Sequence, residues 1–479
     1  MSQLTSCQYK TSFATAGLLD SPPAQRYTPL MKVSKQRHTI ILLSLLLSSI
    51  LASCSPGHLG SNEIAFVRDG HLWTIDPDGS NTFEVVTDNT TVIGYAWSPD
   101  HQIFTFRTLD GNFAKTAAGQ HLASNIITGL TSDVPSVLNT VGLDGGTPIP
   151  ITVSSSDIQR SNAWWNPTGN RLLYREETTA SIQNPGTQSW WISQNDQPLD
   201  IARKLLPYTY SIPSISASNS LTIGNSSQGV FTTPLAGTQF QYVIQGTLPG
   251  HPLPAALERV LWQPAHQNPS ILYAIVPVSS KPQPSSFTSM TIQLVLRDPH
   301  GQTTTIATCT CTQFAWSPNG NYVLYSTGTM FTILSIKDLT SFSISGENGS
   351  VPYWSPDSHF ILFDGLHTLQ LVNLAGQRQI SLLNDSSVGS GTNPSMMPDA
   401  RALLQPISNS IWASDSRHFL FLTRDRLSWQ GKSLTSGKGL YTVSIDDRGQ
   451  VQGSPMVVDT GNDSQAGWTY EYPSTSFLF

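Results

Sequence analysis

Short apolar runs of strand length recur along this chain, each a few residues after a tryptophan and a tight turn. The run 322–325 follows Trp316-Ser317-Pro318-Asn319, the run 361–363 follows Trp354, and the run 103–106 follows Trp97. Proline presets φ near −65° and Asp, Asn or Gly completes a tight turn, while Ile, Val, Leu, Phe and Tyr favour a strand. The pattern therefore predicts repeated pairs of antiparallel strands.

Weaker copies of this unit begin at Trp165, Trp262 and Trp412, and a degenerate copy fits 215–235. Each clear copy is followed by a second alternating strand, as at 331–336, 368–374 and 440–445. Three or four short antiparallel strands per unit are typical of a propeller blade. Because a single blade cannot bury both of its faces, the blades must stack on one another. We expect eight blades, with seven as the alternative.

The two ends of the repeat region complement each other. The first strand, from Ile64, has no Trp-Ser-Pro turn before it, and apolar residues at 467–473 and 477–479 lie at the other end. We expect the C-terminal strand or strands to pair with the N-terminal blade, which leaves no open sheet edge. The fold class is therefore a single closed all-β propeller. Two long insertions, 111–136 and 384–406, are predicted to be surface loops.

The N-terminal region has the features of an export signal. Met31 begins a basic stretch, the apolar run 40–51 is too short to span a bilayer, and Leu51-Ala52-Ser53-Cys54 follows. We expect residues 1–30 to be a non-structural extension, 31–53 a lipoprotein signal peptide, 54–62 a lipidated tether and 63–479 the propeller. An ordinary N-terminal membrane anchor is the alternative.

Two stretches resemble known families. Leu51-Ala52-Ser53-Cys54 resembles the lipobox of bacterial lipoproteins, which implies that Cys54 carries the diacylglyceryl group. The motif at Trp97, Trp316 and Trp354 resembles the WSPDG-type repeat of TolB-like β-propellers, relatives of WD-repeat proteins, over about residues 60–479. The resemblance implies an exported location and a role in protein–protein contact.

Composition narrows the possible partners and leaves the state of two cysteines open. Removal of residues 1–53 takes away five of the 25 basic residues and one of the 31 acidic residues, which leaves 20 and 30. With no basic run in the chain, this balance argues against nucleic acid. Cys309 and Cys311 would face the same side of a strand, and three states compete: two packed thiols, a disulfide, or half of a metal site.

Catalytic motifs are lacking in the sequence, which contains no nucleophile elbow, zinc-protease helix or phosphate-binding Gly loop. Asp100, Asp357 and Asp415 are expected to cap turns, and Asp76-Pro77-Asp78-Gly79 is expected to be a hairpin turn rather than a Ca²⁺ loop. We therefore predict no catalytic residue, no metal and no cofactor.

Aromatic pairs supply the candidate ligand contacts. In each of Trp164-Trp165 and Trp190-Trp191, adjacent strand residues face opposite sides, so one ring should pack between blades. Trp164, Trp190 and Trp191 are the candidates for stacking on a ligand, with inter-blade packing as the alternative for each of them.

These features predict a non-enzymatic scaffold on the outer face of the cytoplasmic membrane that binds a protein, peptide or glycan of the cell envelope. One alternative is a propeller enzyme, a hydrolase or lyase acting on polysaccharide. A second alternative is a sensor or accessory subunit of an envelope complex.

Overall fold

The computed structural model describes residues 63–468, with internal gaps. These gaps are residues 88–89, 125–133, 167, 179–187, 194–201, 208–213, 219–220, 227–228, 235–240, 246–259, 276–290, 312, 348, 366, 385–403, 406–409, 425–427, 430–431 and 435–437. The predicted extension, signal peptide and tether (1–62), with Cys54, therefore lie outside the described residues, as do 469–479. No helix among the residues described is long and apolar enough to cross a membrane.

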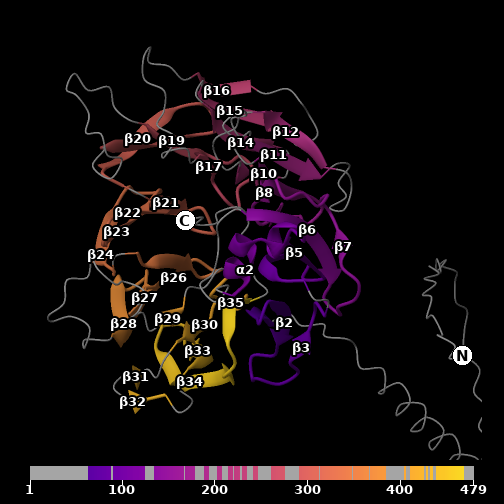
Figure 1. The fold of residues 1–479 in the computed structure, drawn as a ribbon. Helices are drawn as coiled ribbons and strands as arrows, with labels where there is room; N and C mark the ends of the chain where they lie inside the picture. Colours follow the sequence, from indigo (N-terminus) through magenta and orange to yellow (C-terminus); the bar gives the residue numbers. More distant parts are fainter. Residues whose placement is uncertain are drawn as a thin grey trace, which may run out of the picture. The chain divides into compact units, whose positions relative to one another are not determined.

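The described chain is almost entirely antiparallel sheet (Figure 1). The first sheet has the order β3-β2-β1-β35, with strands Phe83–Glu84, His71–Ile75, Ile64–Arg68 and Asp463–Trp468. A C-terminal strand thus completes the sheet of the first three strands, and Ile64 pairs with Trp468 in the register. Figure 1 shows β35 beside this N-terminal sheet.

The second sheet contains nine strands, because two four-stranded units are joined through β8 (Ile158–Arg160). This short strand pairs with both β6 and β10. The sequence pattern did not indicate the junction, since Ile158–Arg160 has only three residues and no motif. The remaining strands of this sheet are β4 Val92–Trp97, β5 Ile103–Leu109, β6 Val134–Gly142, β7 Ile149–Pro150, β9 Trp164–Trp165, β10 Leu172–Thr178, β11 Gln188–Ser193 and β12 Ala202–Pro207.

Five further four-stranded sheets follow in chain order. In the first four, neighbouring strands are consecutive in sequence, and the last has the order β29-β30-β33-β34 with a separate β31-β32 hairpin. Their strands are β13 Ser214–Ile215, β14 Leu221–Ser226, β15 Gly229–Pro234 and β16 Gln241–Gln245; β17 Val260–Trp262, β18 Ile271–Ile275, β19 Ile292–Arg297 and β20 Thr303–Cys309; β21 Gln313–Trp316, β22 Tyr322–Thr327, β23 Met330–Ser335 and β24 Ser341–Ser345; β25 Val351–Trp354, β26 Phe360–Asp364, β27 Thr368–Asn373 and β28 Arg378–Asn384; β29 Leu404–Gln405, β30 His418–Thr423, β31 Ser428–Trp429, β32 Lys432–Ser433, β33 Gly439–Ile445 and β34 Val451–Asp459.

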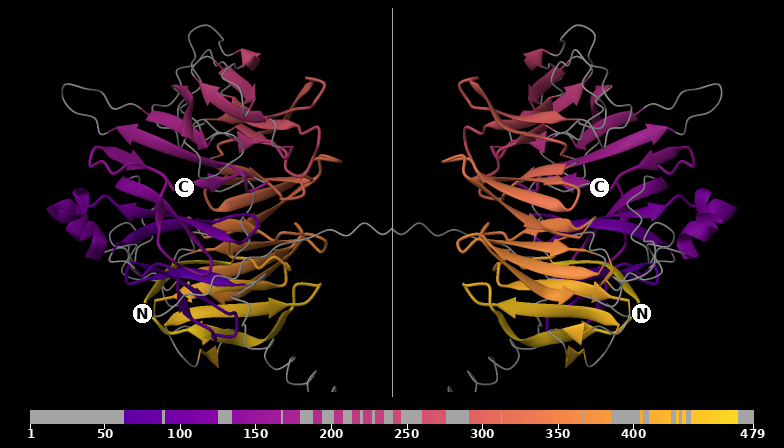
Figure 2. Two further views of the ribbon diagram at one scale, coloured as in Figure 1. Left: turned by 90° about the vertical axis from the view of Figure 1, so that its right-hand side faces the viewer. Right: turned by 90° about the vertical axis from the view of Figure 1, so that its left-hand side faces the viewer.

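Apolar clusters join neighbouring sheets, as stacked blades require. The motif residues Trp97, Trp316, Trp354 and Trp412 are each at most 2% exposed, and each belongs to a cluster that draws on two or more sheets. The cluster that contains Trp412 also joins the last four-stranded sheet to the sheet of β1 and β35. In the side views the strands lie in layers one above another (Figure 2). The predicted all-β, propeller-type fold is confirmed, while ring closure and a count of eight blades stay predictions.

The first long insertion is not structureless where it is described. It contains the 3₁₀ helix η1 (Phe113–Lys115) and the α-helix α2 (Ala117–Ser124), which project from one edge of the sheets (Figure 2). Alanine favours the helix, and the Thr116 hydroxyl accepts the Gly119 amide as an N-cap at 3.1 Å. Leu122 packs on the cluster between the first two sheets. The second predicted insertion, 384–406, is described only at Asn384 and β29.

Candidate functional site

The predicted ligand-stacking tryptophans lie within the sheets rather than at a shared opening. Trp190 is 1% exposed, and its ring centroid is 5.4 Å from that of Trp164 in a cluster that reaches the next sheet. Trp190 is therefore packed between blades, which was the alternative to stacking on a ligand. Trp164 and Trp191 are half-buried, and their stacking on a ligand stays a prediction.

The two cysteines of the propeller are joined as a disulfide between Cys309 and Cys311 at the end of β20. Of the three states that the sequence left open, this is the one in the structure. Cys311 is buried, with 5% of its surface exposed. Among the described residues, no group of three or more His, Cys, Asp or Glu is placed to hold a metal ion.

The carboxylate Glu176 lies at the junction of β8 and β10, where it pairs with Arg160 in the register. Its Oε1 accepts from Nε of the buried Arg160 at 2.8 Å, and Arg160 also donates to the backbone carbonyls of Ser136 and Val153. The same burial, with the nearby Glu176 charge, raises the pKa of Tyr174. This polar group fastens the two joined units and leaves little of Glu176 available to a ligand.

The motif turns use their polar side chains within the fold. In the turn after Trp354, Ser355 Oγ donates to Asp357 Oδ1 at 2.6 Å and accepts the Phe360 amide at 2.9 Å. The turns after Trp97 and Trp316 repeat the arrangement with Asp100 and Asn319. The predicted turn-capping role of Asp100 and Asp357 is thus present in the structure, as is that of Asp415, which accepts the Arg417 amide at 2.8 Å.

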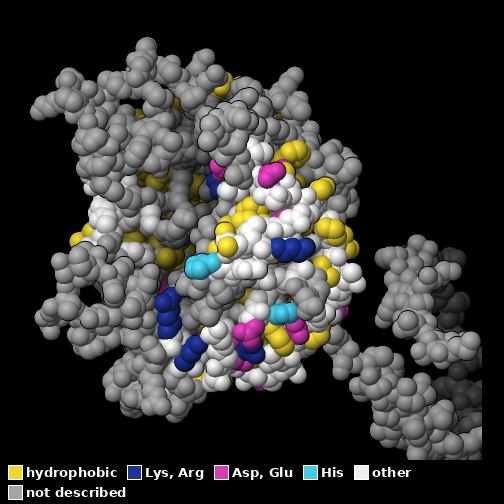
Figure 3. Space-filling model, viewed as in Figure 1, with side chains coloured by type: hydrophobic (Ala, Val, Ile, Leu, Met, Phe, Trp, Pro, Cys, Tyr) yellow, Lys and Arg dark blue, Asp and Glu magenta, His cyan; other side chains and the backbone are white. Residues whose placement is uncertain are grey.

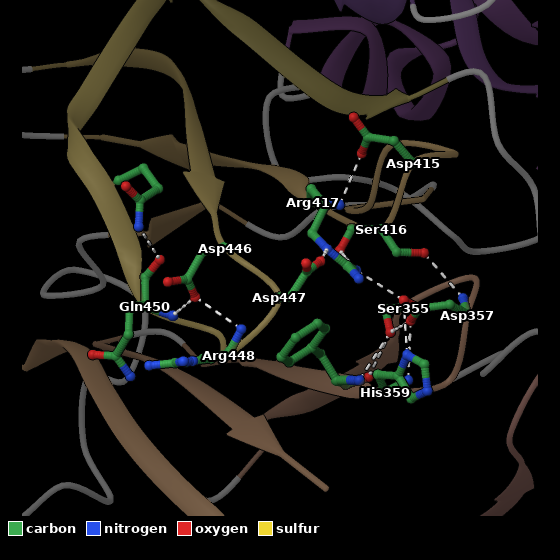
Figure 4. Close-up of polar contacts among 12 residues, drawn as sticks. Ser355, Asp357, His359, Asp415, Ser416, Arg417, Asp446, Asp447, Arg448 and Gln450 are labelled. Carbon is green, nitrogen blue, oxygen red and sulfur yellow. Dashed lines mark hydrogen bonds and ion pairs between the residues drawn. The ribbon is translucent and has the colours of Figure 1, made fainter. Parts of the chain in front are cut away.

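The same turns also contact one another across sheets (Figure 4). Ser416 Oγ accepts the Asp357 amide at 3.0 Å, and Arg417 bridges Asp357 and Asp447 at 2.8 and 2.9 Å. Ser358 Oγ accepts the Asn319 amide in the same way, at 3.0 Å. These groups have partners within the molecule, so they are structural contacts and not a reactive site.

A cavity of about 530 Å³ lies between the turn that joins β2 to β3 and one face of the last four-stranded sheet. The turn contributes Asp76, Pro77 and Asp78. The sheet contributes residues from three strands, His418 of β30, Thr442 and Ser444 of β33, and Ser454 and Met456 of β34. Its volume is within the range of about 300–1,000 Å³ that is usual for ligand pockets.

Backbone geometry holds the two walls of the cavity together. Gly79 has φ of +83°, and a Cβ at that position would lie 2.7 Å from the Val458 carbonyl oxygen, so the turn rests directly on β34. Within the sheet, His418 pairs with Ser444 and Thr442 pairs with Met456. Cross-strand partners face the same side, which sets these four side chains on one surface.

The cavity presents hydrogen-bonding groups that the described chain leaves without partners. Thr442 is only 4% exposed, yet no described residue bonds its hydroxyl. The hydroxyls of Ser444 and Ser454 are likewise without a hydrogen bond to the described part of the chain. Thr442 is not among the described residues whose polar atoms are both buried and unbonded, so its hydroxyl is open to the cavity and can bond a ligand there.

Carboxylates give the cavity a negative character. Hydrogen bonds from the Ser80 hydroxyl and amide lower the pKa of Asp78, so this carboxylate is ionised near neutral pH. His418 Nδ1 lies 2.6 Å from Asp415 Oδ2, which orients the imidazole. No Lys or Arg is among the described residues that line the cavity.

The arrangement supports binding better than catalysis. Asp415, His418 and the adjacent Ser444 include the residue types of a nucleophilic triad. A working triad needs a hydrogen bond between nucleophile and base, and among the described residues none joins Ser444 to His418.

Sequence reasoning missed this site, although a signal was present. Polar Thr442 and Ser444 alternate with apolar residues in β33, which indicates one polar face on a strand that is otherwise part of the core. On the face shown in Figure 3, the coloured basic and acidic side chains are scattered and form no large patch of one charge.

Comparison with known proteins gives resemblances to solved structures alone. No protein-family model matches the chain, and no curated protein matches it. The chain is similar to a eukaryotic initiation factor at 12% identity and a TM-score of 0.48, covering 86% of this chain and 99% of that one. It is also similar to TolB from Acinetobacter baumannii at 15% identity and a TM-score of 0.33, covering 67% and 72%.

A further similar structure is the C-terminal WD40 domain of Sif2, at 11% identity and a TM-score of 0.42, covering 81% of this chain and 94% of that domain. At these identities and scores, the resemblances assign neither an activity nor a partner to this chain.

Proposed function

We propose that this chain is an exported lipoprotein, anchored through Cys54 to the outer face of the cytoplasmic membrane. Its propeller binds a protein, peptide or glycan of the cell envelope without catalysing a reaction. The leader at 31–53 supports the export and the anchor. The Cys309–Cys311 disulfide supports an oxidising compartment, because cytosolic thiols are kept reduced.

The observation that carries the binding role is the cavity between the β2–β3 turn and the last sheet. It combines a volume of about 530 Å³ with the hydroxyl of Thr442, a largely buried residue that lines the cavity and whose hydroxyl no described residue bonds. By contrast, the other polar groups singled out from the sequence, the Asp residues of the motif turns, are occupied by contacts within the fold. These open hydrogen-bonding groups support the cavity as the place where a partner binds.

A cavity-blocking variant tests the binding role. Ser454 is exposed on β34 at the cavity wall, so Ser454→Trp would fill the space with little disturbance of the core. We expect this variant to lose partners that co-purify with the wild-type protein from detergent-solubilised membranes. The matched control is Met330→Trp on β23, a residue 40% exposed in another sheet. Equal recovery of every partner with all three proteins would contradict the proposal.

The anchor is tested separately by Cys54→Ser. We expect the variant to leave the membrane fraction or to remain unprocessed, because the acyl chains can no longer be attached. Unchanged membrane fractionation together with unchanged lipid labelling would contradict the lipid anchor and leave the binding role standing.

A further inference from the structure

We propose that the cavity between the β2–β3 turn and the last sheet binds a basic side chain, lysine or arginine, of the partner polypeptide. This inference rests on the proposed binding function and names the chemistry of the group that enters the site.

Charge is the first argument. Asp76 and Asp78 stand on one wall, and Asp415 lies behind His418 on the other. No Lys or Arg is found among the described lining residues to neutralise them. A site with carboxylates and no basic residue favours a cation over a neutral or anionic ligand.

The second argument is the hydrogen-bonding state of the two turn carboxylates. Asp76 Oδ2 accepts from Asn81 at 2.6 Å and from Ser80 at 3.3 Å, while Asp78 Oδ1 accepts the Ser80 hydroxyl and amide. The turn is thereby fixed in place through one oxygen of each carboxylate. Asp76 Oδ1 and Asp78 Oδ2 accept no hydrogen bond from the described chain, so they remain for a donor from outside.

The third argument is independent of charge and comes from the opposite wall. Thr442 is 96% buried and lines the cavity, and its hydroxyl is not bonded by any described residue. An ammonium group carries three donors and a guanidinium five, so a basic side chain can bond the carboxylates and this hydroxyl together. Pro77 and Met456 offer apolar surface for the aliphatic stem of such a side chain.

The experiment uses the lipidated protein in detergent, produced with methionine labelled with ¹³C at its methyl group. Five of the seven methionines of the sequence follow Cys54, and the signal of Met456, which is 46% exposed at the cavity, is assigned by its loss in Met456→Leu. The probe is N-acetyl-lysine methylamide, compared with the uncharged N-acetyl-norleucine methylamide of similar shape. We expect a saturable shift of the Met456 signal with the lysine probe and none with the norleucine probe.

Two variants separate the cavity from general charge effects. The double variant Asp76→Asn, Asp78→Asn keeps an acceptor oxygen on each turn residue but removes both negative charges. We expect it to bind the lysine probe at least tenfold more weakly, a loss of about 1.4 kcal/mol in binding free energy. The control is Asp298→Asn, because Asp298-Pro299-His300-Gly301 forms a similar turn between β19 and β20, away from the cavity. We expect this control to bind the probe as the wild type does.

Several results would overturn the inference. Equal shifts with the lysine and norleucine probes, or no shift with either, would exclude a basic occupant. A Met456 shift produced by Ca²⁺ and not by the lysine probe would instead assign a metal site. If Ser454→Trp still abolished partner capture in those cases, the proposed binding function would stand and this inference alone would fail.

Discussion

Arg68 Nε donates to Asp463 Oδ1 at 2.8 Å, and this contact joins β1 to the C-terminal strand β35 across 395 residues of sequence. Arg68 Nη2 also contacts Asp459 Oδ1 of β34 at 2.6 Å. One guanidinium thus ties together the N-terminal strand, the C-terminal strand and the last outer strand. The Asp463 side chain is fully buried, and burial, partly offset by Arg68, raises its pKa to about 6.

This ion group makes the stability of the protein dependent on pH. The pKa of Asp463 in the folded state is above its ordinary value of 3.8, so the folded protein binds this proton more tightly than the unfolded chain does. The stability gained from this is present below about pH 4 and is lost as the pH rises to about 6. Arg68→Met removes the cation that opposes this rise in pKa. The pKa of Asp463 is therefore higher still in the variant, and at pH 8 the folded variant must either bury an unpaired carboxylate, which costs about 3–5 kcal/mol, or keep Asp463 protonated far above its ordinary pKa.

We therefore expect Arg68→Met to lower the Tm more at pH 8 than at pH 5, where Asp463 can be protonated. Thermal unfolding at the two pH values measures the difference. The control is Lys438→Met, which removes an exposed contact to Asn462 in the same region and should change the Tm little at either pH. An equal loss for Arg68→Met at both pH values would contradict the role assigned to Asp463.

Backbone strain in the motif turns gives a second expectation. Ala265 has φ of +58° and is exposed three residues after Trp262, while Gly320 has φ of +69° in the turn that follows Trp316. Ala265→Gly should stabilise the protein by about 0.5–1 kcal/mol, because the left-handed region disfavours a Cβ. Gly320→Ala should destabilise it, since its Cβ would lie 2.7 Å from the Pro264 carbonyl oxygen. Tm shifts of the same sign in both variants would contradict this account.

Contacts between neighbouring turns can be tested at Ser416, which is buried with φ of +59° and accepts the Asp357 amide. Ser416→Ala removes this acceptor and should cost about 1–2 kcal/mol. Ser416→Gly loses the same bond but relieves the strain of the positive φ. We therefore expect its Tm to lie between those of the wild type and the alanine variant. A stability of Ser416→Ala equal to that of the wild type would show that the turn-to-turn bond contributes nothing.

The Cys309–Cys311 bond predicts the reactivity of the two thiols. In protein denatured with excess N-ethylmaleimide and no reductant, we expect the peptide carrying Cys309 and Cys311 to remain unlabelled. After reduction the same peptide should gain two labels. Mass spectrometry measures both states, and two labels without reductant would show packed free thiols instead.

The repeat could be predicted from the sequence because its signal is local. Each motif copy places Trp, a turn and a strand within some ten residues, and Trp97, Trp316 and Trp354 are all buried as the pattern requires. The junction through β8 was not predictable in this way. Arg160, which binds Glu176 there, is an isolated charge in a polar stretch until two sheets come together around it.

The cavity was not predictable for the same reason. Asp76 and Thr442 lie more than 360 residues apart and meet only because the first sheet packs beside the last. The sequence shows the alternation of Thr442 and Ser444, but it cannot show which turn covers them. The aromatic pairs were a stronger local signal, and Trp190 turned out to be buried between sheets.

The central claim, that a partner enters this cavity, is tested most directly by photo-crosslinking in cells. A photoreactive p-benzoylphenylalanine is placed at Ser454 in the membrane-anchored protein, and separately at Met330 on β23 as the control position. We expect a discrete adduct from position 454 that is absent from position 330 and is lost when Asp76 and Asp78 are both changed to Asn. Adducts that are the same from both positions, or no adduct from position 454, would contradict the account.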